Sequence, residues 1–234
     1  MKTIAVNGAS STQEIYLDEK HRWSSLIGAK YNLALGGGSN DRMFRTTIKF
    51  LNHTPIDVLI LGWVMWNRTS LTKSNGSYYV VCNAPAHDED DNQEQDDEVY
   101  KFYLKKMFNE YLQLENTLNY MLHIQNYCLA KGIRLVNFAS GFGPDHFAYS
   151  ELEKIAKESY VFNNKDKKIV MQVQRQNTER LTAIIDQLDP NTWVNKRVFF
   201  SMEEGLKDLP KIDSMGHFGI EGSKQWAQII QQHI

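Results

Sequence analysis

The sequence predicts an α/β fold of three layers, α/β/α, in which helices cover both faces of a central parallel sheet. Short apolar runs alternate with helical patterns along the chain, which is the order of βαβ units. One run, Val58–Leu61, is apolar at every position, as a strand buried on both faces is. The 234 residues are 42% hydrophobic and 23% charged, a globular composition. Without an internal repeat or a long linker, residues 1–234 are expected to form a single domain.

The expected strands are short. The first covers residues 3–7 and ends in a turn at Gly8. The other strands expected in the sheet are residues 31–35, 57–62 and 133–139. A further apolar stretch runs over residues 78–86.

Apolar residues at helical spacing predict the helices between these strands. The expected helical stretches are residues 23–29, 40–51, 99–131, 151–188 with a break near 163–167, and 219–234. Ser39, Asn40 or Asp41 could cap the second helix, and Gly132 ends the third as a C-terminal cap does. In such a fold the active crevice lies outside the carboxyl ends of the strands.

Composition and charge exclude several classes of protein. Lys and Arg number 26 and Asp and Glu 28, so nothing marks a nucleic-acid surface or a polybasic membrane anchor. The longest strongly apolar run, Val58–Trp66, is too short to span a membrane, and the N-terminus lacks the apolar region of a signal peptide. Two cysteines are too few for a disulfide framework. We therefore expect a cytoplasmic protein with no nucleic-acid or membrane partner.

The most acidic stretch, His87–Glu98, lacks the Gly and the terminal Glu of a calcium loop. It is expected to be a solvated insertion around residues 83–98. The histidines show no metal-binding spacing, so neither a metal nor a cofactor is expected.

Residues suited to chemistry follow the expected strands. Ser10 comes just after the turn at Gly8, where neighbouring N–H groups can face an oxyanion. Three glycines, Gly36–Gly38, follow the second strand and let the backbone approach a ligand closely. Near the C-terminus, His217 stands in a Gly-bounded loop before the last helix. A neutral imidazole there can act as the base for a serine, and Asp213 can fix its tautomer.

In this order, these features resemble the SGNH, or GDSL-type, hydrolases over nearly the full chain. The first block is Gly8-Ala9-Ser10-Ser11-Thr12, similar to the Gly-x-Ser-Phe-Thr block of a branch frequent in phages and bacteria. The second block is Asn32-Leu-Ala-x-Gly-Gly-Gly-Ser-Asn, preceded by Trp23, and the last is Gly216-His217-Phe-Gly-x-x-Gly. The resemblance implies a flavodoxin-like fold and cleavage of an ester, for example of an acyl group on a carbohydrate.

The resemblance also implies roles for single residues. Ser10 would be the nucleophile, His217 the general base and Asp213 the third member of the triad. The oxyanion donors would be the N–H of Ser10, the N–H of Gly37 with that of Gly38 as an alternative, and the side-chain amide of Asn67 or Asn40. Apart from the resemblance, Trp63 at the end of the third strand, with Arg42 and Arg68, would contact a small-molecule or glycan ester. Core packing is the other use open to Trp63, and helix-face salt bridges are the other use open to the arginines, Arg45 included.

Three departures from the family pattern leave a second hypothesis open. Ala9 replaces an aspartate, the third block reaches Asn67 only five residues after Gly62, and Asp213 precedes His217 by four residues. A protein that keeps the fold but serves as a binding or structural component, such as part of a virion, would show such changes. A homo-oligomer or a virion partner is compatible with the sequence. A nucleotide site is disfavoured because the glycine loop lacks a lysine.

Overall fold

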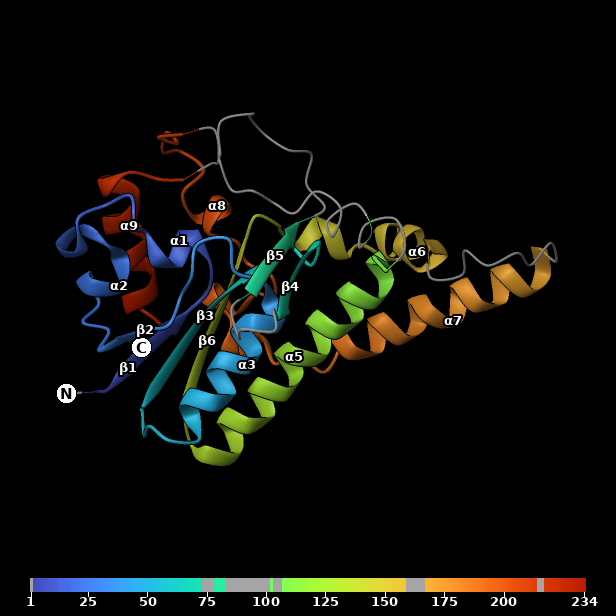
Figure 1. Ribbon diagram of the computed structural model, residues 1–234, viewed down its shortest axis with the longest axis horizontal. Coiled ribbons are helices and arrows are strands. Elements are labelled where there is room, and N and C mark those ends of the chain that lie inside the picture. The colour runs from blue at the N-terminus through green and yellow to red at the C-terminus, as the bar shows by residue number, and fades with distance from the viewer. Residues whose placement is uncertain (1, 73–77, 83–101, 103–106, 159–166, 214–216) are drawn as a thin grey trace.

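The central sheet contains four parallel strands, as the sequence predicts. A computed structural model describes residues 2–72, 78–82, 102, 107–158, 167–213 and 217–234. The strands stand in the order β2-β1-β3-β6 (Figure 1). They are β1 (Ile4–Asn7), β2 (Tyr31–Asn32), β3 (Val58–Val64) and β6 (Arg134–Ser140). The α/β class is confirmed.

Helices cover both faces of the sheet because the strand side chains are apolar on both sides. Ala5 and Leu59 face one core, and Val6 and Ile60 face the other. The first face is covered by α3 (Asn40–Leu51), α5 (Glu110–Lys131), α6 (Tyr149–Glu158) and α7 (Lys167–Ile185). The second is covered by α2 (Trp23–Leu26), α8 (Met202–Gly205) and α9 (Ile220–Gln231). This is the expected three-layer arrangement.

Two strands differ in length from the expectation. β3 continues two residues beyond the predicted end and pairs with β6 through Val64 and Ser140. β2 is only two residues long, but the backbone of the next three residues still follows β1. The N–H of Leu33 donates to the carbonyl of Val6, and that of Leu35 to the carbonyl of Gly8. The second strand therefore leads the glycine loop directly to the end of the first.

The apolar pattern predicts one helix from residue 99, but residues 107–109 are not helical and the long helix α5 begins at Glu110. Most of the expected stretch before residue 107 lies outside the described residues. Asn109 is the N-cap of α5. Its backbone is extended, and its side chain accepts a hydrogen bond from the N–H of Leu112. The predicted C-terminal cap is confirmed, since Gly132 has a φ of 67°.

The remaining elements are short or lie beside the sheet. They are α1 (Ser10–Gln13) and the 3₁₀ turns η1 (Glu19–His21), η2 (Pro144–Phe147), η3 (Pro190–Thr192) and η4 (Val194–Lys196). The expected break near 163–167 lies outside the described residues, apart from Lys167, which begins α7. The expected acidic insertion around 83–98 lies outside the described residues. Among the described helices, none combines the length and apolar character that crossing a membrane requires.

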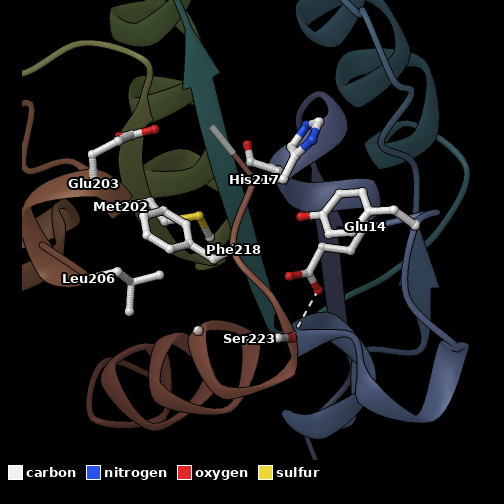
Figure 2. A pocket seen from close by; sticks show the side chains of 10 residues that line it. Glu14, Met202, Glu203, Leu206, His217, Phe218 and Ser223 are labelled. Carbon is white, nitrogen blue, oxygen red and sulfur yellow. Dashed lines mark hydrogen bonds between the residues drawn. The ribbon is translucent and has the colours of Figure 1, made fainter. Parts of the chain in front are cut away.

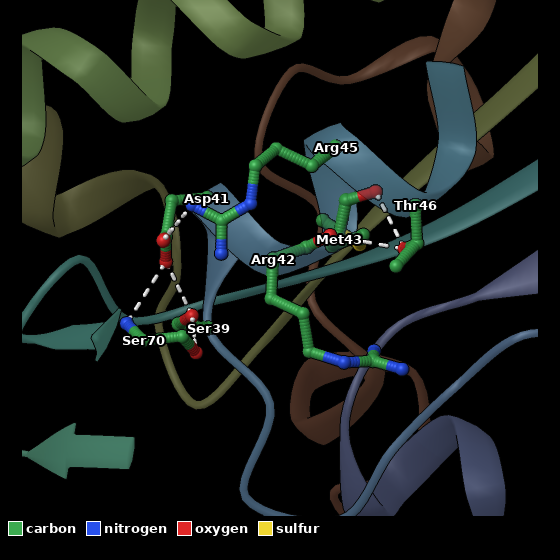
Figure 3. A network of polar contacts seen from close by, with 7 residues as sticks. All are labelled: Ser39, Asp41, Arg42, Met43, Arg45, Thr46 and Ser70. Atoms are coloured by element: carbon green, nitrogen blue, oxygen red, sulfur yellow. Dashed lines mark hydrogen bonds and ion pairs between the residues drawn. The ribbon is translucent and has the colours of Figure 1, made fainter. Parts of the chain in front are cut away.

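A separate antiparallel hairpin follows β3, formed by β4 (Arg68–Thr72) and β5 (Tyr78–Cys82). Asp41, in the first turn of α3, anchors it (Figure 3). Its carboxylate accepts hydrogen bonds from the N–H of Ser70, at 3.2 Å, and from the hydroxyl of Ser39, and it pairs with Arg45 at 3.0 Å. Arg45 therefore forms a salt bridge on the face of α3, which was the alternative to a substrate contact.

Candidate active site

The end of β1 is packed so tightly that only glycine fits at position 8. A Cβ atom on Gly8 would lie 2.2 Å from Oγ1 of Thr12, on the helix that follows. Asn7 is buried beside it, donates to Oγ1 of Thr47 and accepts from the N–H of Gly8. Thr12 thus packs α1 directly against the end of the strand. Asn7 links the same end to α3.

The first turn of α1 presents two serines. Within the described residues, the N–H groups of Ser10 and Ser11 donate to no acceptor, as is usual at a helix N-terminus. The Ser10 hydroxyl likewise has no hydrogen-bond partner there. The Ser11 hydroxyl is bonded to that of Ser140, at the end of β6, with an Oγ–Oγ distance of 2.6 Å. Of the two serines, Ser10 is therefore the one whose hydroxyl has no partner among the described residues.

The glycine loop leaves one N–H unused within the described part of the chain. Gly36 donates to Oε1 of Gln13, and Gly38 donates to the carbonyl of Leu35 at 2.8 Å. Gly37 has a φ of 69°, and no hydrogen bond from its N–H is found among the described residues. Gly37 therefore fits the predicted oxyanion donor, whereas the N–H of the alternative, Gly38, is already occupied.

His217 is held by Asp213 through two hydrogen bonds. Nδ1 of the imidazole lies 2.6 Å from Oδ2, and the N–H of His217 donates to Oδ1 at 3.0 Å. The N–H of Ile212 donates to the carbonyl of His217, so the two segments run side by side as in a hairpin. This geometry explains why a spacing of four residues still brings the carboxylate to the ring. The imidazole side chain is 12% exposed and that of Asp213 36%.

A small pocket lies beside this histidine (Figure 2). Ser11, Tyr16 and His217 contribute to its wall, and Glu14 lies across it from Met202. The ring of Tyr16 stacks on the imidazole with a centroid distance of 4.5 Å and an interplanar angle of 28°. The cavity has a volume of about 10 Å³, which is the room that a single water molecule needs.

Glu14 carries a buried carboxyl group at the base of this pocket. It is 2% exposed, and its Oε2 accepts from the N–H of Trp23 at 2.6 Å and lies 3.1 Å from the hydroxyl of Ser223. Burial raises the pKa of Glu14 to about 7, although these hydrogen bonds and the charge of Arg22 act in the opposite direction. The group thus titrates in the range where a histidine does.

Comparison with known proteins places the fold. Neither a protein-family model nor a curated protein sequence matches the chain. The crystal structure of TesA aligns with 99% of this chain and 97% of its own, at a TM-score of 0.50 and 10% identity. The protein has the SGNH hydrolase fold.

Two esterase structures align less closely. EstA from Pseudoalteromonas sp. covers 100% of this chain and 96% of its own, with a TM-score of 0.48 and 9% identity. Axe2, an acetylxylan esterase from Geobacillus stearothermophilus, covers 99% and 93%, with a TM-score of 0.48 and 10% identity.

Two of the site contacts expected from the sequence are wrong. Asn40 is 2% exposed, and its amide is bonded through both ends to the backbone of Val64, with a further bond to Thr117. It clamps α3 to the end of β3 and has no free donor for an oxyanion. Trp63 is fully buried and donates to Oδ1 of Asn137, so it packs in the core and does not face a substrate.

The remaining expected site residues, Arg42, Arg68 and Asn67, lie near the edge of the central sheet. The guanidinium of Arg42 is 3.5 Å from the carbonyl of Leu33, at the base of the glycine loop. Arg68 begins β4 and is half-buried. Asn67 is half-buried just before it, and within the described chain its side-chain amide makes no hydrogen bond, so that Nδ2 is available as a donor. Asn67 thus stays a candidate for the third oxyanion donor.

Sequence reasoning missed Tyr16, Glu14 and Ser140. Each reaches the site through a contact between distant segments, and none belongs to a motif. The one available signal was local: a polar Glu14 only four residues after Ser10 is unusual in a turn that must pack on a buried strand. Among the residues that the structure describes, no three His, Cys, Asp or Glu side chains cluster as metal ligands do.

Proposed function

We propose that the protein is a serine hydrolase that cleaves an ester through Ser10, His217 and Asp213. The observation that carries the proposal is the double hydrogen bond between Asp213 and His217, in a loop whose imidazole borders the same pocket as Ser11. Ser10 precedes Ser11 in the first turn of α1, so nucleophile and base would come from neighbouring segments. The fold supports this assignment because the site stands at the carboxyl ends of the strands.

The chemistry follows from the atoms that are free. Because Nδ1 of His217 is bonded to Asp213, Nε2 is the nitrogen left to accept the proton of Ser10. The Ser10 oxygen then bonds to the ester carbonyl carbon, and the tetrahedral oxyanion accepts from the N–H groups of Ser10 and Gly37. As the C–O bond to the alcohol breaks, the imidazolium gives its proton to the leaving oxygen. Water repeats the sequence and releases the acid.

Hydrolysis of a p-nitrophenyl acetate series tests this proposal. Ser10→Ala is expected to lower kcat by on the order of 10³ or more, because the covalent step is lost. Ser11→Ala is the matched control: it removes a hydroxyl from the same turn, and most of the activity should remain. Equal rates for the wild type and Ser10→Ala would overturn the assignment.

A non-catalytic role is the second candidate, and one observation favours it. Within the described residues, His217 is hydrogen-bonded to neither serine, and the hydroxyl of Ser11 is bonded to Ser140. A fluorophosphonate probe distinguishes the two functions. Labelling that needs both Ser10 and His217 supports the hydrolase, whereas a chain that stays unlabelled and forms a stable complex with a glycan or a protein supports the binding role.

A further inference from the structure

A second and larger cavity lies at the same edge of the sheet, beyond the ends of β3 and β6. Its volume is about 270 Å³, compared with about 10 Å³ beside His217. Met65 and Trp66, which follow β3, and Ile155 of α6 form its apolar floor. Binding sites for drug-sized ligands are typically about 300–1,000 Å³, so this cavity suits a single small ring.

The loop after β6 contacts residues of both this cavity and the candidate active site. The Ser140 hydroxyl touches that of Ser11, and two residues further on the ring of Phe142 packs edge-on against Trp66, with centroids 5.8 Å apart. Residues 140–142 therefore contact Ser11, in the first turn of α1, at one end and Trp66, in the cavity floor, at the other. A substrate attacked at Ser10 could reach the cavity with its alcohol portion.

Four polar side chains surround the apolar floor: Glu110, His146, Glu151 and Lys154. The indole N–H of Trp66 donates to Oε1 of Glu110 at 3.2 Å, and among the described residues no donor is bonded to Oε2 of this carboxylate. Lys154 pairs with Oε1 of Glu151 at 2.7 Å, and the second oxygen of this carboxylate has no partner within the described part of the chain. His146 uses Nδ1 with the backbone of Gly143, and its Nε2 has no hydrogen-bond partner among the residues that the structure describes.

These groups fit a polyhydroxyl ligand better than an ion. Each hydroxyl of a sugar can donate to a carboxylate oxygen and accept from an ammonium or imidazole N–H. The C–H face of the ring can lie against the apolar floor. An anion would meet two carboxylates and only one lysine, itself already paired. A metal ion would lack a ligand set, since no cluster of three ligating side chains occurs in the described chain.

We propose that this cavity binds one neutral sugar ring and that the ring is the alcohol portion of the ester cleaved at Ser10. The second half of this statement rests on the proposed hydrolase function, and the first half does not. Glu151 is the specificity-determining group because it reaches the cavity from α6 while Lys154 holds its other oxygen.

Binding is measured with the Ser10→Ala protein, so that it does not depend on catalysis. Methyl β-D-glucopyranoside is titrated to about 100 mM while the indole N–H resonances are followed by NMR, with Trp66→Phe assigning the signal of Trp66. A saturable shift of that signal with a roughly millimolar Kd is expected. Glu151→Gln, which keeps the shape but weakens the acceptor, should raise Kd about fivefold. Glu153→Gln, exposed on the same helix, should not change it.

The outcomes distinguish the sugar site from the proposed ester hydrolysis at Ser10. No saturable shift, or the same Kd in Glu151→Gln as in its parent, overturns the sugar site. Tighter binding of tetramethylammonium chloride than of the glucoside also overturns it, because the cavity would then be a cation site. If the glucoside binds but the wild type cleaves no p-nitrophenyl ester, the sugar site stands and the hydrolase proposal falls. If the wild type cleaves the ester but binds no glucoside, the hydrolase proposal stands and the sugar site falls.

Discussion

The phenol ring of Tyr16 lies against the imidazole of His217, with centroids 4.5 Å apart and the planes inclined by 28°. Asp213 holds the same imidazole in its plane through Nδ1. One contact therefore limits rotation of the ring out of its plane, and the other limits rotation within it. A general base must keep its free nitrogen aimed at the nucleophile, so both contacts are expected to affect catalysis.

Replacing Tyr16 tests the first contact. Tyr16→Ala should lower kcat by about tenfold, because a stacked aromatic pair contributes roughly 0.5–1.5 kcal/mol to holding the ring. Tyr16→Phe retains the stack and should keep most of the activity. Steady-state kinetics on p-nitrophenyl acetate measure both, and Tyr149→Ala, on an exposed tyrosine of α6, serves as the control. A loss in Tyr16→Phe as large as in Tyr16→Ala would argue that the hydroxyl acts and the stack does not.

Asp213→Asn tests the second contact. The asparagine can still accept from the N–H of His217 through Oδ1, so the loop should keep its shape. It can no longer stabilise the imidazolium, and kcat should fall by on the order of 10²–10⁴. Circular dichroism checks the fold, and Asp208→Asn, at an exposed site, is the matched control. Unchanged kcat in Asp213→Asn would mean that His217 works in a dyad with Ser10.

Glu14 predicts a pH dependence of stability. Its pKa is about 7 in the folded chain and near 4.5 when unfolded, because burial disfavours the charged form. Between these values the folded state binds more protons than the unfolded state. The free energy of unfolding therefore falls as pH rises from 4.5 to 7, by up to about 1.4 kcal/mol per pH unit, and is constant outside this range as far as Glu14 is concerned.

The contacts of Glu14 explain why the protonated form is tolerated. Ser223 has one hydroxyl hydrogen and two oxygens in reach, Glu14 Oε2 at 3.1 Å and the carbonyl of His21 at 2.6 Å. If the hydrogen goes to His21, a protonated Glu14 can donate to Ser223.

Urea denaturation of Glu14→Gln at about pH 5 and pH 8 measures the effect. The variant should lose most of the pH dependence that the wild type shows, whereas Glu221→Gln, with an exposed side chain, should retain it. Parallel curves for Glu14→Gln and the wild type would contradict the raised pKa.

The sheet and the order of its helices were predictable because they depend on patterns within single segments. Val58–Leu61 is apolar throughout since both faces of β3 are covered, and that requirement is visible in the sequence. The start of α5 was not predictable, because helical spacing continues upstream of Asn109, where a single side-chain bond determines the boundary.

The residues of the candidate site likewise fall into those that a short motif predicts and those that only packing brings together. Ser10, Gly37 and His217 stand in short motifs, and the structure brings the histidine loop to the pocket bordered by Ser11. Tyr16 reaches His217 from 201 positions away, a packing contact that leaves no trace in local composition. Asn40 was misread for a related reason. An asparagine beside a glycine loop suggests a ligand, but its amide bonds to the end of a strand that lies beside it only after folding.

At Gly62, β3 packs closely against both a core ring and the helix that carries the proposed nucleophile. A Cβ atom at this position would lie 2.6 Å from Cζ of Phe138 and 2.6 Å from Oγ1 of Thr12, in the helix that carries Ser10. Gly62→Ala must therefore displace a fully buried ring or shift α1. We expect it to destabilise the fold by about 1–3 kcal/mol, the usual cost of overpacking.

The same substitution should lower kcat more than it raises KM, because it moves Ser10 relative to His217 without touching the sugar cavity. Gly143→Ala is the matched control, since its Cβ would meet no atom within 4 Å and its φ of −137° suits alanine. Urea denaturation gives the stability, and p-nitrophenyl acetate hydrolysis gives the kinetic constants at a temperature where both variants are folded. A Gly62→Ala protein as stable and as active as Gly143→Ala would show that α1 can move away from β3 at no cost, and the tight seating of Ser10 would have to be abandoned.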